Sequence, residues 1–184
     1  MELDVWLVRH GETEWSAARR FAGWSDLALT AAGEAQAAAL VGLLPTGQGV
    51  RAWTSDLRRC VDTARLAGLA ATPDRRLREL DFGDVDGAAW DELPSEVQDQ
   101  LLAFDGFAAP NGESVEQLRT RVHEFLRSLA PGRHVVVTHG GVVRQLLRDA
   151  GADGAVVTGE VVRVQFAAAG AAMMTPCLVD PSSC

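Results

Sequence analysis

Residues 5–13, VWLVRHGET, set an apolar run directly against an arginine, a histidine and a glycine. A short, continuous apolar run bounded by polar residues is typical of a strand that is buried on both faces of a sheet. Arg9 and His10 follow the end of this strand, and Gly11 lets the backbone turn sharply there. Because ligands bind at the carboxyl ends of strands in open α/β sheets, the stretch predicts a binding site at Arg9 and His10.

The same pattern recurs near the other end of the chain. Residues 134–141, HVVVTHGG, again form an apolar run that ends in His-Gly. If the two runs are neighbouring parallel strands, His10 and His139 emerge at the same edge of one sheet. Two imidazoles and an arginine at one edge of the sheet indicate a catalytic site.

Expected strands alternate with expected helices along the chain, which predicts a mixed or parallel sheet covered on both faces. Strands are expected at residues 2–8, 50–53, 135–138, 161–166 and 171–178, with an extended segment at 77–80. Helices are expected at residues 30–44, 55–69, 91–103, 113–129 and 141–150. The 184 residues suit one domain, 1–184, with a sizeable core. We therefore expect an α/β fold, a three-layer α/β/α sandwich with a mostly parallel central sheet.

Composition argues against several classes of protein. No apolar stretch approaches the roughly 20 residues that span a bilayer, so no membrane partner is expected. No basic segment with an apolar signal region precedes the first strand, which favours a cytoplasmic location. The net charge of −8 argues against nucleic-acid binding. Cys60, Cys177 and Cys184 are widely spaced, which favours free thiols over disulfides or a zinc site.

The segment RHGET at residues 9–13 resembles the signature of the histidine phosphatase superfamily, the phosphoglycerate-mutase-like enzymes. Further segments match in the right order: GWSDLALTAAG at 23–33, TSDLRRCVDTA at 54–64, LRELDFGDVDG at 77–87, NGESVEQLRTRV at 111–122 and VVVTHGG at 135–141. Ordered segments are far more specific than one RHG triplet. The resemblance implies the phosphoglycerate-mutase-like form of the sandwich fold.

The resemblance also implies a set of catalytic residues. It assigns His10 as a nucleophile that carries a phosphoryl group, because a neutral imidazole nitrogen can attack phosphorus. Arg9 and Arg59 match the arginines that neutralise the transferring group, a task suited to planar guanidinium forks. His139 matches the second histidine, which donates to the phosphate. Glu79 matches the acid that protonates the leaving oxygen and later activates water.

Secondary phosphate contacts follow from the same resemblance. Thr13, Gly23 and Gly140 fall where the family places them. The longer family pattern has an asparagine where this chain has Ser16, so a contact from Ser16 would be shorter in reach or mediated by water. No metal or organic cofactor is implied, because the arginines supply the positive charge.

The sequence leaves the identity of the acid open. Asp81, Asp84 and Asp86 lie close to Glu79 and could take its role if the local backbone differs from the family. A zinc or iron site built from the two histidines and Glu79 is the main alternative to a phosphohistidine site. The adjacent arginines would repel a dication, which disfavours a metal.

Residues 79–113 are expected to form a short acidic cover segment over the site. From Glu79 to Leu118 the chain has no basic side chain, and a cover of negative sign would repel a second anionic group on a substrate. The segment also offers aromatic side chains, among them Phe82, Trp90 and Phe104. Phe21, Trp24 and Trp90 themselves are expected to serve in packing.

These observations favour a phosphatase that acts on a small phosphorylated metabolite with a neutral or partly apolar leaving group. The length of the chain and its DFGD segment are similar to α-ribazole phosphatases. Three alternatives stay open: a phosphoglycerate mutase, a phosphohistidine-protein phosphatase, and a non-catalytic binding module on the same fold. The sequence does not decide between a monomer and a homodimer, or whether residues 91–109 move as a lid.

Overall fold

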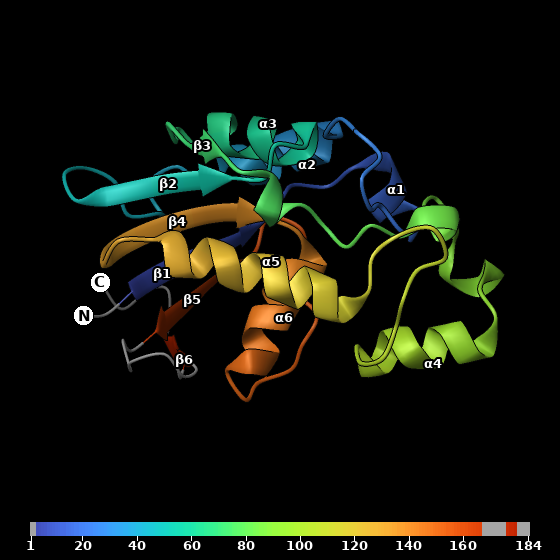
Figure 1. The fold of residues 1–184 in the computed structure, drawn as a ribbon. Helices are drawn as coiled ribbons and strands as arrows, with labels where there is room; N and C mark the ends of the chain where they lie inside the picture. The colour runs from blue at the N-terminus through green and yellow to red at the C-terminus, as the bar shows by residue number, and fades with distance from the viewer. Residues whose placement is uncertain (1–2, 167–175, 180–184) are drawn as a thin grey trace.

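The computed structural model describes residues 3–166 and 176–179, and a mixed sheet lies at its centre (Figure 1). Within these residues the strand order is β3-β2-β4-β1-β5-β6. The strands are β1 (Leu3–Arg9), β2 (Val50–Thr54), β3 (Thr72–Pro73), β4 (Gly132–Thr138), β5 (Val161–Phe166) and β6 (Pro176–Val179). β1 to β4 run parallel, β5 is antiparallel to β1, and β6 is antiparallel to β5. The prediction of a mostly parallel sheet is confirmed.

Helices cover both faces of the sheet, which gives the three layers expected from the sequence (Figure 1). The helices are α1 (Glu14–Ala17), α2 (Ala31–Ala38), α3 (Arg58–Leu66), α4 (Ser95–Ala103), α5 (Val115–Ser128) and α6 (Gly140–Asp149). Trp6 and Val8 of β1 are buried on the face covered by α2 and α3. Val5 and Leu7 are buried on the face covered by α5 and α6. Successive strand residues point to opposite faces, so the apolar run of β1 contributes to both cores.

The pairing of β1 with β4 brings the two His-Gly segments together. The strands are parallel neighbours, with Val8 opposite Val137 and Arg9 opposite Thr138. The backbone N–H of His10 donates to the carbonyl oxygen of Thr138 at 2.9 Å, which extends the pairing past the end of β1. His10 and His139 therefore leave the sheet at the same edge, as the sequence predicts.

Two expected helices differ from the structure at their ends. α2 ends at Ala38, and residues 39–43 continue only as turns, with Gly42 in the left-handed region at φ 81°. α3 begins at Arg58 after Leu57, which makes no side-chain cap hydrogen bond. The expectation that Ser55 or Asp56 caps α3 is therefore wrong.

The helix expected at residues 91–103 is divided in two. A short 3₁₀ helix, η3 (Trp90–Glu92), precedes α4, and Pro94 lies between them. Proline has no N–H to continue a helical ladder, which explains the break. The extended segment expected at 77–80 overlaps the end of another 3₁₀ helix, η1 (Arg75–Leu77). Of the last expected strand, residues 171–175 lie outside the described residues, and β6 begins at Pro176.

The cover segment, residues 79–113, contains the 3₁₀ helix η2 (Gly83–Val85), η3 and α4, and it lies beyond the carboxyl ends of the parallel strands (Figure 1). None of the helices formed by residues 3–166 is long and apolar enough to cross a membrane. Cys60 is a buried free thiol, as expected. The same expectation for the Cys177 side chain and for Cys184 lies outside the described residues.

Candidate active site

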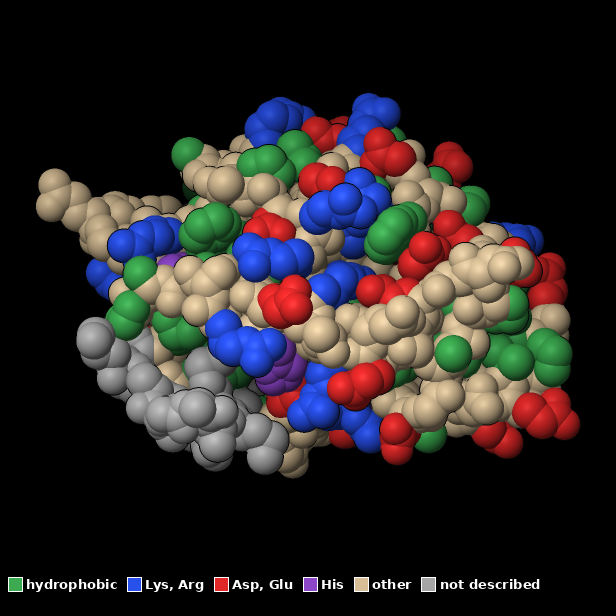
Figure 2. Space-filling model, in the orientation of Figure 1, with side chains coloured by type: hydrophobic (Ala, Val, Ile, Leu, Met, Phe, Trp, Pro, Cys, Tyr) green, Lys and Arg blue, Asp and Glu red, His purple; other side chains and the backbone are tan. Residues whose placement is uncertain are grey.

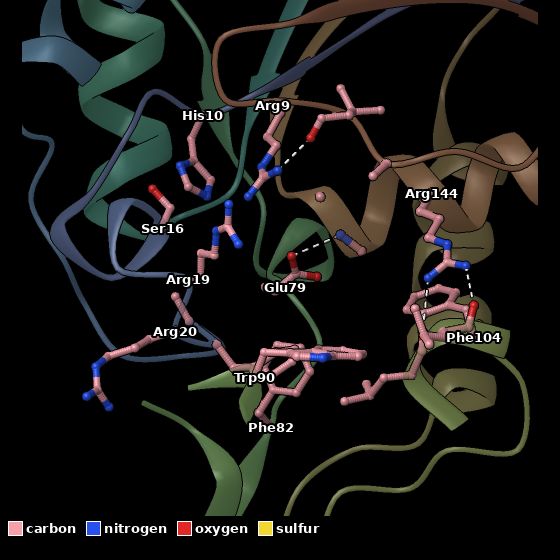
Figure 3. A pocket seen from close by; sticks show the side chains of 18 residues that line it. Arg9, His10, Ser16, Arg19, Arg20, Glu79, Phe82, Trp90, Phe104 and Arg144 are labelled. Carbon is pink, nitrogen blue, oxygen red and sulfur yellow. Dashed lines mark hydrogen bonds between the residues drawn. The ribbon is translucent and has the colours of Figure 1, made fainter. Parts of the chain in front are cut away.

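His10 lines a cavity of about 540 Å³ at the carboxyl ends of β1 and β4 (Figure 3). Its Nδ1 lies 2.7 Å from the carbonyl oxygen of Gly11. A carbonyl oxygen only accepts, so Nδ1 carries the proton and Nε2 keeps its lone pair. Burial, together with the positive charges of Arg59 and Arg9, lowers the pKa of His10 to about 3. His10 is therefore a neutral imidazole with an unprotonated Nε2 at neutral pH.

His139 follows β4 and lies beside His10, with the ring centroids 5.2 Å apart and the rings edge to face. Its Nδ1 accepts a hydrogen bond from Nε of Arg59 at 3.2 Å. The proton therefore sits on Nε2, which donates to Oγ of Ser55 at 2.9 Å. Burial and then the charge of Arg59 lower the pKa of His139 well below its ordinary value. Both ring nitrogens of His139 are engaged within the protein.

Arg59, from α3, is fully buried beneath the loop that follows α1. Its Nη1 donates to the carbonyl oxygen of Ser25 at 2.7 Å, and its Nη2 donates to those of Gly23 at 2.7 Å and Ala22 at 3.1 Å. A buried cation needs such partners, since an unpaired one would be strongly destabilising. Neither Arg59 nor His139 is among the residues that line the cavity. The structure places both as buried neighbours of His10.

Arg9, the last residue of β1, reaches the cavity wall beside His10 (Figure 3). Its Nη1 donates to the carbonyl oxygen of Val156 at 2.5 Å, while its buried Nε has no hydrogen-bond partner among the described residues. Burial lowers the pKa of Arg9 from its ordinary value. Gly140 lies directly against this side chain, since a Cβ at Gly140 would be 3.3 Å from Cζ of Arg9. Glycine therefore leaves room for the guanidinium at the start of α6.

Glu79, the first residue of the cover segment, follows η1 and lines the cavity. Its Oε1 accepts the backbone N–H of Leu80 at 2.9 Å, and its Oε2 accepts that of Gly141 at 2.9 Å. The residue is 8% exposed, so it touches the cavity but little solvent. Two backbone donors thus hold the carboxylate in one orientation.

The other three candidate acids lie elsewhere. Asp86 accepts the backbone N–H of Gly23 at 2.7 Å and so holds the loop above Arg59. Asp81 and Asp84 make their hydrogen bonds to residues 83 and 111. Glu79 is the only acidic residue among the described residues that line the cavity. Gly23 is likewise engaged within the protein and does not line the cavity.

Thr13 and Ser16 form a reciprocal cap at the start of α1. Oγ1 of Thr13 accepts the backbone N–H of Ser16 at 3.2 Å, and Oγ of Ser16 accepts the backbone N–H of Thr13 at 2.9 Å. Thr13 is fully buried, whereas Ser16 lines the cavity (Figure 3). Of the residues expected to contact phosphate, the structure therefore brings Ser16 and Gly140 to the cavity and leaves Thr13 behind it.

The far side of the cavity is apolar and comes largely from the cover segment. The lining here consists of Phe21, Ala22, Phe82, Trp90, Leu101, Leu102, Phe104, Ala155 and Val156. Phe21 packs against Phe82 and Trp90, with ring centroids 5.0 Å and 6.0 Å away. Phe21 and Trp90 therefore pack, as expected, but they also face the cavity. Trp24 does not, and its Nε1 donates to the carbonyl oxygen of Glu79 at 2.9 Å.

Apart from Glu79, the acidic side chains of the cover segment do not line the cavity. Asp91, Glu92, Glu96, Asp99 and Asp105 are exposed, and Figure 2 shows acidic side chains gathered over the outer surface of this region. The expectation that negative charge on the cover would meet the substrate is therefore wrong. The spacing of apolar residues in the sequence did not reveal this arrangement. The cover consists of short, irregular elements, and each of them places only single apolar side chains toward the cavity.

Four arginines that sequence reasoning did not single out contribute to the site. Arg19, Arg20 and Arg144 line the cavity (Figure 3). Arg144, from α6, donates to the carbonyl oxygens of Leu101 at 3.0 Å and Leu102 at 2.6 Å, and so fastens the end of α4 to α6. Arg121, from α5, donates to the carbonyl oxygen of Glu79 at 2.8 Å. No signal in the sequence separates these arginines from ordinary surface arginines.

Known proteins resemble this chain in sequence. The model of the histidine phosphatase superfamily (branch 1) matches residues 5–157. A curated protein of Serratia proteamaculans named "Probable phosphoglycerate mutase GpmB" is 44% identical over 151 residues, which are 75% of this chain and 70% of that protein.

Solved structures show the same fold. A crystal structure of a phosphoglycerate mutase from Thermus thermophilus is 48% identical, with a TM-score of 0.83 over 89% of this chain and 92% of that one. A structure from Escherichia coli described as a "putative alpha-ribazole-5'-P phosphatase" is 25% identical, with a TM-score of 0.78 over 97% of this chain and 96% of that one.

Proposed function

Because this chain belongs to the histidine phosphatase superfamily, we propose that it is a phosphomonoester hydrolase that works through a phosphohistidine on His10. The observation that carries the proposal is the state of His10. Its Nδ1 proton is held by the carbonyl oxygen of Gly11, and its Nε2 lone pair is free beside Arg9 and Glu79 at the cavity. A fixed, neutral imidazole is the form that attacks phosphorus.

In the first step, Nε2 of His10 forms a bond to phosphorus as the bond from phosphorus to the ester oxygen breaks. The leaving oxygen takes a proton from the carboxyl group of Glu79, and the leaving group departs as an alcohol. Arg9 compensates the charge on the equatorial phosphoryl oxygens. Burial of His10, together with the positive charge of Arg59 beneath it, keeps the imidazole unprotonated.

In the second step, a water molecule attacks the phosphohistidine. Its proton goes to the carboxylate of Glu79, the bond between phosphorus and Nε2 breaks, and inorganic phosphate leaves. His10 returns to its neutral form and Glu79 to its protonated form, so the cycle balances. Arginines supply the positive charge throughout, and no cofactor enters either step.

The apolar wall supports a small phosphorylated metabolite with a neutral or partly apolar leaving group. The wall built around Phe82, Trp90 and Phe104 gives such a group contact area beside the phosphoryl site. An α-ribazole phosphate, whose leaving group is a neutral nucleoside, is one candidate of this kind. We also propose a cytoplasmic location for this activity.

A phosphoglycerate mutase is the second candidate, and the names of the relatives together with the arginines at the cavity favour it. A mutase substrate carries a carboxylate besides its phosphate. However, Arg20 already bonds to Glu92 and to the carbonyl oxygen of Gly87, and Arg144 bonds to Asp153. Most of this positive charge is therefore committed to the cover segment and its neighbours.

The first test is phosphate release from a panel of monoesters in the presence of EDTA. The panel contains α-ribazole 5′-phosphate, an aromatic ester, sugar phosphates, 3-phosphoglycerate and a phosphohistidine peptide. We expect turnover of the nucleoside or aromatic ester, and we expect His10→Ala to lower it at least ~10³-fold by removing the nucleophile. His123→Gln, which alters a histidine of α5 that bonds to Asp149 and does not line the cavity, is the matched control and should retain turnover.

Other outcomes would contradict the proposal. Interconversion of 2- and 3-phosphoglycerate without phosphate release would identify a mutase. Preference for the peptide would identify a protein phosphatase. Loss of all turnover in EDTA, restored by a divalent cation, would show a metal-dependent reaction.

A further inference from the structure

Arg19 occupies an unusual backbone position directly after α1. Its φ of 54° lies in the left-handed region, which side chains other than glycine rarely adopt. The N–H of Arg19 donates to the carbonyl oxygen of Ser16, and the N–H of Arg20 donates to that of Trp15 at 2.8 Å. This pair of bonds is a Schellman motif, and Arg19 stands where glycine is usual. The backbone at Arg19 is therefore strained.

The side chain of Arg19 extends into the cavity toward His10 and Arg9 (Figure 3). Within the described residues its guanidinium makes no hydrogen bond, ion pair or ring contact. Arg9, Arg20 and Arg144, which line the same cavity, each donate to protein carbonyl oxygens. Arg19 thus keeps its full set of donors at the cavity.

Backbone strain at a residue whose unpartnered charge faces a cavity indicates a functional role for that residue. Glycine at this position would relieve the strain and remove a positive charge that lies near that of Arg9. The chain nevertheless has an arginine here, despite the backbone strain and the repulsion from Arg9. Strained residues of this kind gather at sites where geometry serves function.

We propose that Arg19 is a phosphate-binding residue that contacts the transferring phosphoryl group from the side of the cavity opposite Arg9. This inference rests on the proposed function and names a contact for it. Arg9 is anchored through its Nη1, and Arg59 is enclosed by carbonyl oxygens. Arg19 supplies the planar fork that neither of them leaves open.

The test compares Arg19→Gly, Arg19→Asn and Arg19→Lys with the wild-type protein. Glycine and asparagine both tolerate the left-handed backbone, so their agreement separates loss of the guanidinium from a change in backbone freedom. Lysine keeps the charge without the fork. Arg127→Ala, on the exposed side of α5, is the control for loss of one positive charge. Inorganic phosphate is the probe, measured as a competitive inhibitor of p-nitrophenyl phosphate hydrolysis.

We expect the inhibition constant for phosphate to rise about 10- to 100-fold in Arg19→Gly and Arg19→Asn, with a similar fall in kcat/KM, and to change less in Arg19→Lys. The melting temperature of Arg19→Gly should stay the same or rise, because the strain is relieved. This combination distinguishes a binding role from a structural one.

Two results would overturn the inference while leaving the proposed function intact. In the first, wild-type protein hydrolyses the ester, but Arg19→Gly binds phosphate as tightly. In the second, Arg19→Gly affects only a substrate with an additional carboxylate, such as 3-phosphoglycerate, which would place Arg19 on the leaving group. If the wild-type protein neither hydrolyses any monoester nor is protected against heat by phosphate, the proposed function fails as well.

Discussion

Oε2 of Glu79 accepts the backbone N–H of Gly141 at 2.9 Å, which ties the candidate acid to the first turn of α6. Glycine is required for this approach, because a Cβ at Gly141 would clash with Oε1 of Glu79. The same helix begins directly after His139. The acid and the two histidines are thus positioned by adjoining segments.

Glu79→Gln should slow the hydrolysis of phosphate esters by a factor that depends on the leaving group. A glutamine cannot donate a proton to the departing oxygen, so kcat/KM for an alkyl phosphate should fall about 100-fold or more. p-Nitrophenolate leaves without protonation, so kcat/KM for its ester should fall far less. Asp84→Asn, which alters an acid that does not line the cavity, is the control. Equal losses for both esters would show that Glu79 is not the acid.

The pH profile of the free enzyme should lack a histidine limb near neutrality. Since burial lowers the pKa of His10 to about 3, the imidazole stays neutral as pH falls and is lost as a nucleophile only near that value. An acid limb in kcat/KM near pH 6 should instead follow the second ionisation of the substrate's own phosphate, at about 6. Measurement with an alkyl and an aryl phosphate decides the matter, because the limb should move with the ester. A limb at one pH, about 6.5, for both esters would assign it to His10.

Stability should decline on mild acidification. His10 and His139 have pKa values below those of the unfolded chain, so below about pH 6.5 the unfolded state binds protons that the native state does not. The free energy of unfolding should therefore fall by roughly 1 kcal/mol per histidine between about pH 7 and pH 5.5. Burial also lowers the pKa of His134, so three histidines contribute to the slope. Urea titrations at both pH values give the slope, and His10→Gln should reduce it by the share of one histidine. An unchanged slope in His10→Gln would mean that this imidazole titrates normally.

Arg121→Lys should impair the acid, although Arg121 does not contact the carboxylate of Glu79. The guanidinium donates to the carbonyl oxygens of Arg76, Arg78 and Glu79 and forms a two-bond ion pair with Glu113. A lysine ammonium cannot span these acceptors, so the segment that carries Glu79 should shift. We expect loss of about 1–3 kcal/mol of stability and a selective fall in alkyl ester turnover.

A double-mutant cycle separates positioning from a purely structural role for Arg121. If Arg121 acts through Glu79, adding Arg121→Lys to Glu79→Gln should lower kcat/KM little further. Arg119→Lys, on the same helix but paired with Asp149, is the matched control. Additive losses would contradict the positioning role.

The sequence predicted the fold and the centre of the site where its signals were local. The apolar run of β1, its copy in β4 and the strand–helix alternation predict the sheet. The parallel pairing of β1 with β4 confirms that His10 and His139 leave it at the same edge. The capped, amphipathic α5 lies at Val115–Ser128, close to its expected range. Such features depend on residues near one another in the chain.

What the sequence did not predict depends on contacts between distant segments. Ser55 suits a helix cap, but His139, far along the chain, takes its hydroxyl as an acceptor. The charge of the cover segment predicted an acidic wall, yet packing of Phe82 against Phe107 and Phe21 turns the apolar side chains inward. Arg19 and Arg121 gain their significance only from where the fold places them. None of these outcomes has a periodic signature.

The enclosure of Arg59 by the carbonyl oxygens of Ala22, Gly23 and Ser25 bears on how inactive relatives of this protein would be recognised. A chain that lost turnover would still need Arg59 to satisfy those carbonyls, and would still need His139 as its neighbour. Their presence in a homologue therefore reports foldability. His10 and Glu79, whose side chains reach the cavity, are not needed to satisfy those carbonyl oxygens. They are therefore the positions at which a pseudoenzyme would first diverge.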